Sequence, residues 1–75
     1  MASLLTMCGA ADSGLLARIV GIFHQLGLPP PSLEVRVSGD RMVALLAVGS
    51  LELDQRQAVS RKIGAFVGVD YCILS

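Results

Sequence analysis

Three consecutive prolines, Pro29–Pro31, separate two stretches of opposite hydrophobic periodicity. Before them, apolar residues recur at steps of three and four, which is the pattern of an amphipathic helix. After them, apolar and polar residues alternate, which is the pattern of a half-exposed strand. Because proline lacks a backbone N–H and cannot continue a helix, the chain must leave this segment extended. The sequence therefore predicts a helix that lies on a sheet, followed by a strand at the edge of that sheet.

The predicted first helix starts at Ser13, with Asp12 as its N-cap and Gly27 as its C-terminal stop. Its inner face is expected to be an apolar stripe made of Leu16, Ile19, Val20, Phe23 and Leu26, flanked by Leu15 and Ile22. Gly21 lies in mid-helix, where it costs about 1 kcal/mol relative to alanine. Close packing against a neighbouring element is the expected reason for this glycine.

Five further segments complete the predicted order. Strands are expected at residues 4–8, 33–37, 42–48 and 69–74, and a second helix is expected after an N-cap at Ser50. Residues 9–12 are expected to be a loop, and Ser38–Arg41 is expected to be a hairpin turn. The run from Met42 to Val48 is apolar without alternation, which favours a central strand. Ala58, Val59, Ile63 and Phe66 are expected to form the inner face of the second helix.

The order strand, helix, strand, strand, helix, strand predicts an α+β sandwich of the ferredoxin-like βαββαβ type. Right-handed crossovers then give a four-stranded antiparallel sheet with both helices on one face. A chain of 75 residues has room for a single domain, expected over residues 1–75. Hydrophobic residues make up 53% of the chain and charged residues 16%. We therefore expect the open sheet face or a sheet edge to be an interface.

Charge and cysteine content exclude several classes of function. Six Lys and Arg balance six Asp and Glu, so no net field attracts nucleic acid or an anionic membrane. The apolar run at the N-terminus is too short to cross a bilayer. Cys8 and Cys72 are too few for a disulfide framework and lack metal-binding spacing, which favours a reducing, cytoplasmic compartment.

Reactive groups are sparse, and one loop is a candidate for ligand binding. His24 is the only histidine, and no partner residues for nucleophilic catalysis accompany it. We therefore expect a chain that is not an enzyme and holds no metal or cofactor. Asp12, Ser13, Gly14 and Leu15 are the candidate effector-binding residues, because a glycine-containing turn at a helix N-terminus offers backbone N–H groups to a carboxylate.

Two segments, DSGLLARIVGIF at 12–23 and SLEV at 32–35, resemble the ACT domain of the small regulatory subunit of acetolactate synthase. The similarity resumes at Arg41 and continues to Val69. The resemblance implies a homodimer that pairs through its edge strands and activates a large, thiamine-diphosphate-dependent catalytic subunit in branched-chain amino acid biosynthesis. The cofactors would belong to that partner.

The resemblance also indicates which residues form an interface and where the chain departs from the family. Leu33, Glu34, Val35 and Arg36, together with Leu15 and Ile22, are the expected dimer or partner contacts. The family commonly has asparagine where this chain has Ala11 and Pro29, so activation of a partner is favoured over amino acid feedback. A stand-alone ACT dimer that senses an amino acid remains the alternative. Glu34 and Arg36 either face solvent or meet their mates across a two-fold axis.

Overall fold

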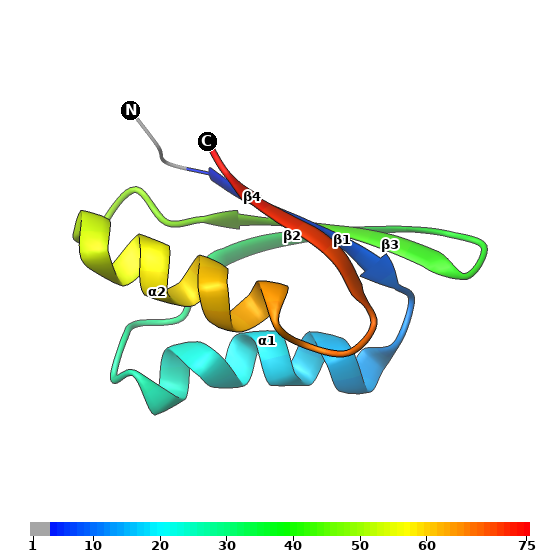
Figure 1. The fold of residues 1–75 in the computed structure, drawn as a ribbon, viewed down its shortest axis with the longest axis horizontal. Coiled ribbons are helices and arrows are strands. Elements are labelled where there is room, and N and C mark those ends of the chain that lie inside the picture. The colour runs from blue at the N-terminus through cyan, green and yellow to red at the C-terminus, as the bar shows by residue number, and fades with distance from the viewer. Residues whose placement is uncertain (1–3) are drawn as a thin grey trace.

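The computed structural model describes residues 4–75 of the predicted domain and has the expected order of elements. These are β1 (Leu4–Ala10), α1 (Ser13–Gln25), β2 (Ser32–Ser38), β3 (Arg41–Ala47), α2 (Leu53–Gly64) and β4 (Val69–Leu74). The strands form one four-stranded sheet in the order β2-β3-β1-β4, and each neighbouring pair is antiparallel. Both helices lie on the same side of the sheet (Figure 1). The predicted ferredoxin-like α+β fold is confirmed.

The hydrophobic core lies between the sheet and the helices. Alternate residues of β1 and β3 point toward the helices, as the period of a strand requires. The core consists of Leu5, Met7, Leu15, Ile19, Ile22, Phe23, Met42, Ala44, Leu46, Val48, Leu51, Val59 and Ile63. Full burial of one such leucine or isoleucine contributes about 1.5–3 kcal/mol. The opposite face of the sheet carries no helix and is called the open face below (Figure 1).

The inner face of α1 is rotated from the predicted stripe. Its buried residues are Leu15, Ile19, Ile22 and Phe23, whereas Leu16 is half-buried and Val20 and Leu26 are more than a third exposed. The prediction was wrong in phase because α1 is apolar on more than one side. Hydrophobic periodicity alone then fits two neighbouring faces equally well.

Both ends of α1 follow the prediction. The Asp12 carboxylate accepts a hydrogen bond from the Gly14 N–H at 2.8 Å, which caps the helix. Gly27 has a φ of +68°, and the Leu28 N–H donates to the Phe23 carbonyl at 2.8 Å. This bond pattern satisfies the last carbonyls of the helix, and glycine adopts the required left-handed conformation without strain. The chain is then free to turn back toward the sheet.

Strand β1 continues two residues beyond its predicted end, through Gly9 and Ala10. At Gly9 the register with β4 shifts, and the strands approach so closely that a Cβ atom there would clash with the Gly68 carbonyl oxygen. Gly9 was predicted to begin a loop, but in the structure it permits close contact between the backbones of two strands. The loop is therefore shorter than predicted.

The N-cap of α2 is Glu52, not the predicted Ser50. The Gln55 side-chain oxygen accepts from the Glu52 N–H at 3.0 Å, as in a capping box. Arg56 holds the preceding loop, because its side chain donates to the carbonyls of Leu51 and Gly49 at 2.8 and 3.1 Å. Val59 and Ile63 are buried as predicted.

Candidate functional site

The segment that leads into the predicted effector loop uses several of its backbone N–H groups within the domain. The Ala10 N–H donates to the Gly68 carbonyl, and the Ala11 N–H donates to the Asp40 carbonyl, both at 2.9 Å. The Asp12 N–H donates to the Ala10 carbonyl, and the Gly14 N–H is taken by the Asp12 cap. Of the predicted effector residues, Asp12 and Gly14 therefore have their backbone N–H groups engaged in turn and cap hydrogen bonds. Ser13 is exposed beside the cap.

Two residues expected at an interface are core residues. Leu15 and Ile22 are only 1% and 2% exposed. The Leu15 side chain packs beneath α1 and offers no appreciable surface to a ligand or a partner. Ile22 also belongs to the core, but it borders a groove between the two helices, so the interface prediction is corrected for Leu15 only.

Strand β2 is an edge strand and presents the other predicted interface residues. Leu33 is 38% exposed, and Val37 is 63% exposed on the same side of the strand. Their register partners Leu46 and Met42 are core residues. The helix layer therefore stops short of β2 and leaves an apolar margin along this edge. Three prolines precede the strand.

Glu34 and Arg36 lie on the open-face side of β2. The two side chains form an ion pair with an N–O distance of 3.2 Å, and they are 57% and 76% exposed. Their register partners Leu45 and Val43 also belong to the open face. An exposed pair of this kind contributes at most about 1 kcal/mol to the stability of the domain. The pair also places one negative and one positive charge symmetrically on either side of Val35.

The open face is apolar at its centre. It is formed by Thr6, Cys8, Val43 and Leu45 of the inner strands and by Tyr71 and Ile73 of β4. Tyr71 and Ile73 are 48% and 54% exposed. Neither residue was included in the predicted interface, although the alternation in β4 could have indicated them. An ion pair between Arg41 and Asp70 lies at one end of this face.

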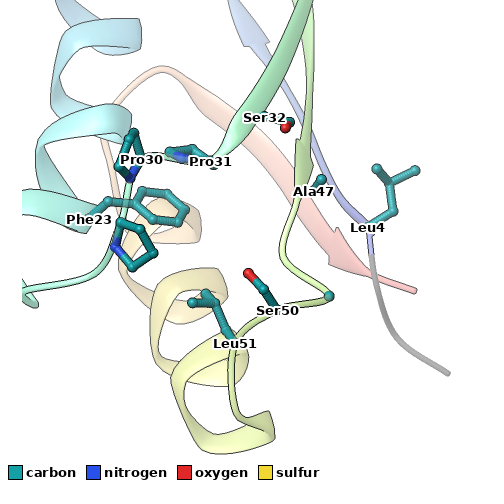
Figure 2. A pocket seen from close by; sticks show the side chains of 10 residues that line it. Leu4, Phe23, Pro30, Pro31, Ser32, Ala47, Ser50 and Leu51 are labelled. Atoms are coloured by element: carbon teal, nitrogen blue, oxygen red, sulfur yellow. The ribbon is translucent and has the colours of Figure 1, made fainter.

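A groove of about 570 Å³ lies where the proline segment approaches the loop between β3 and α2. Figure 2 shows Phe23, Pro30 and Pro31 on one side and Leu51 and Ser50 on the other. Ser32, at the start of β2, also lines the groove. The groove thus adjoins the edge strand at the end remote from the β2–β3 hairpin.

The cysteines are on neighbouring strands but on opposite faces of the sheet. Met7 pairs with Cys72, whereas Cys8 pairs with Tyr71, and both cysteines are free thiols. Burial raises the pKa of the Cys72 thiol, and a hydrogen bond from Ser60 opposes this shift in part. A hydrogen bond with Cys8 and the negative charge of the Cys8 thiolate form both raise the pKa of Tyr71.

Between residues 4 and 75, the structure brings together no group of three or more His, Cys, Asp or Glu suited to a metal ion. Neither α1 nor α2 combines the length and apolar character that crossing a membrane requires. No family model matches the sequence, and no curated protein matches it either.

Proposed function

We propose that this chain is a non-catalytic regulatory subunit that forms a homodimer through β2 and binds and activates the catalytic subunit of acetolactate synthase. The observation that carries the proposal is the self-complementary edge strand. The similarity of residues 12–23 and 32–35 to the regulatory ACT domain supports the choice of enzyme. The proposed subunit acts in the cytoplasm, and the thiamine diphosphate belongs to the partner.

Strand β2 reads as a palindrome of residue classes about Val35. Antiparallel pairing of two copies with Val35 on the two-fold axis places Glu34 opposite the partner's Arg36. Leu33 then lies opposite the partner's Val37, which covers both exposed apolar side chains. An edge strand supplies the unpaired backbone N–H and C=O groups that this pairing needs.

Charge also excludes the neighbouring registers. With Glu34 on the axis, two carboxylates would face each other, and with Arg36 on the axis, two guanidinium groups would do so. Like charges directly opposite each other destabilise a strand pair, whereas opposite charges contribute about 0.2–1 kcal/mol per pair. Val35 is therefore the favoured centre of the interface.

A charge exchange tests the dimer. In Glu34→Arg, each arginine at position 34 faces the partner's Arg36, so we expect dimerisation to weaken about tenfold or more, equivalent to 1.4 kcal/mol or more. The double variant Glu34→Arg/Arg36→Glu restores opposite charges across the axis and should recover the wild-type dissociation constant. Analytical ultracentrifugation over a concentration series measures both. A double variant as weak as the single one would exclude this register.

Reconstitution tests the enzymatic partner. The purified chain is mixed with an acetolactate synthase catalytic subunit, and both complex formation and acetolactate production are measured. We expect co-elution and a higher rate, with no acetolactate formed by the chain alone. Absence of a complex at micromolar concentrations would refute the regulatory role while leaving the dimer unaffected.

A second candidate function is a stand-alone dimer that binds an amino acid. The groove beside Ser32 favours this function. Pairing about Val35 brings the Ser32 end of β2 to the hairpin end of the partner's β2, so the groove lies next to the proposed dimer interface. The Ser32 and Ser50 hydroxyls offer hydrogen bonds within an otherwise apolar lining. Calorimetry with each of the common amino acids is the test, with Ser50→Ala as the variant that should reduce any heat. No heat with any of them would refute this function.

A further inference from the structure

A second groove lies between the two helices, away from the β2 edge. Its volume is about 320 Å³, and it is lined by Arg18, Gly21, Ile22 and Gln25 of α1 together with Lys62, Ala65 and Phe66 of α2 and the turn that follows it. The Arg18 guanidinium lies 5.8 Å from the centre of the Phe66 ring. The groove therefore combines an apolar floor with a cation held over an aromatic face.

Gly21 has no structural reason within the domain to be a glycine. Its backbone is not in the left-handed region, and a Cβ atom built on it would meet nothing within 4 Å. The predicted close packing is therefore wrong. Glycine weakens a helix interior relative to alanine, so its effect here is to deepen the groove. A glycine on a helix surface lets another chain approach the backbone closely.

The groove is positively charged although the chain as a whole is neutral. Arg18 and Lys62 are exposed at its rim, and no aspartate or glutamate lines it. The two ion pairs described between residues 4 and 75 involve Arg36 and Arg41 on the sheet, so neither rim cation is neutralised by such a pair. The complementary partner carries carboxylates beside an apolar group.

We propose that the α1–α2 groove docks an acidic amphipathic helix of a partner protein. One apolar side chain of that helix packs over Gly21 against Phe66, and its carboxylates flank this contact on Arg18 and Lys62. A helix fits better than a free small molecule, because both cations are exposed at the rim and do not enclose a ligand. This docking site goes beyond the proposed function and does not depend on pairing through β2.

The test uses the full chain and synthetic helical peptides. One peptide contains leucine, alanine and glutamate, and two matched peptides keep the same leucines but replace glutamate by glutamine or by lysine. Amide NMR spectra of the isotope-labelled chain are recorded during each titration. We expect shifts centred on residues 18–25 and 62–66 with the glutamate peptide, about tenfold weaker binding of the glutamine peptide, and no binding of the lysine peptide.

Two substitutions separate docking from folding. In Gly21→Leu the side chain occupies the groove. A Cβ atom at position 21 meets nothing within 4 Å and leucine has a higher helix propensity than glycine, so the variant should fold with an undiminished melting temperature while peptide binding falls at least about tenfold. Arg18→Glu should abolish binding of the glutamate peptide. Arg41→Glu, the same change of charge on the sheet, is the matched control and should leave binding unchanged.

Several results would overturn the proposal. These are no shifts with the glutamate peptide at millimolar concentration, equal binding of the lysine peptide, or unchanged binding by a folded Gly21→Leu variant. Amide chemical-shift changes with decanoate, but not with the peptide, would assign the groove to a free fatty-acid carboxylate. Shifts at Gly21 upon simple dilution of the chain would assign it to a second copy.

Discussion

Gly9 and Gly21 both interrupt regular elements, yet their surroundings are opposite. At Gly9 a Cβ atom would clash with the Gly68 carbonyl oxygen and lie 3.1 Å from the Cα atom of Val69. At Gly21 it would meet nothing within 4 Å. The first glycine is required by the approach of β4 to β1, whereas the second is dispensable for folding. The fold therefore requires glycine at position 9 but not at position 21.

Substitution of each glycine by alanine should change stability in opposite directions. Gly9→Ala forces backbone atoms apart and should lower the free energy of unfolding by about 1–3 kcal/mol. Gly21→Ala should raise it by up to about 1 kcal/mol, because alanine favours the helix. In a domain of this size, 1 kcal/mol corresponds to about 4–8 °C in melting temperature. Thermal unfolding measures both, and a Gly9→Ala variant as stable as wild type would contradict the packing argument.

Cys72 should make the domain less stable at alkaline pH. Burial raises the pKa of its thiol above the ordinary value of 9.0. The folded state therefore holds the proton more tightly than the unfolded state, so this stabilising effect is complete below about pH 9 and is lost as the pH rises through the folded pKa. Urea unfolding from pH 7 to 10.5 should show a smaller alkaline decline in Cys72→Ala than in wild type. Identical pH profiles would show that the thiol does not contribute.

Among the elements, α2 depends most clearly on its first turn. The Gln55 side chain accepts a hydrogen bond from the Glu52 N–H, and the Asp54 carboxylate accepts one from the Gln55 N–H, both at 3.0 Å. These bonds satisfy donors that a helix N-terminus leaves without partners. Asp54 also complements the positive end of the helix dipole. The first turn therefore fixes where α2 begins and aligns Val59 and Ile63 with the sheet.

Removal of the Gln55 side chain tests this capping. Gln55→Ala should lower the free energy of unfolding by about 0.5–1 kcal/mol even though alanine has the higher helix propensity. Gln57→Ala, an exposed position on the same helix, is the matched control and should be neutral or slightly stabilising. Chemical denaturation of the two variants provides the comparison. Equal stability of the two would mean that the hydrogen bond to Glu52 contributes nothing.

The sequence predicted the elements better than it predicted their faces. The strand from Val69 to Leu74 and the turn at Gly39 follow from strong local signals, and Gly39 indeed has a φ of +59°. The orientation of α1 could not be predicted, since both Leu15 and Leu16 fit an apolar stripe and only the tertiary structure selects Leu15. Gly9 was interpreted as a loop residue because glycine commonly marks loops. Its contact with Gly68 joins segments far apart in the chain, so no local pattern indicates it.

The candidate sites were predictable to a similarly uneven degree. Alternation along β2 predicted an edge strand and its exposed charges, because a strand's period directly assigns each side chain to a face. The groove between α1 and α2 was not predicted, because Arg18 and Phe66 are brought together only by helix packing. The effector loop was predicted from a local motif, but the N–H groups of the two residues before it, Ala10 and Ala11, donate to the carbonyls of Gly68 and Asp40, and no local pattern reveals these bonds.

For the whole molecule, zero net charge conceals a separation of charges. The α1–α2 groove has two cations at its rim, while β2 carries a balanced pair about Val35. The first arrangement suits an acidic partner, and the second suits a second copy of the same strand. A neutral chain can therefore present two surfaces of different specificity. Because β2 carries one charge of each sign, substitutions that change only these charges can test whether two copies pair through it.

Two single variants that repel themselves should pair with each other. Glu34→Arg places two arginines on β2, and Arg36→Glu places two glutamates there, so each homodimer brings like charges together across the axis. In the mixed dimer centred on Val35, every arginine faces a glutamate. Native mass spectrometry should show mainly monomers in each separate sample and a heterodimer after mixing, at concentrations where wild type is dimeric. Because backbone pairing and apolar contacts are unchanged in all samples, failure of the mixture to dimerise would mean that β2 is not the interface.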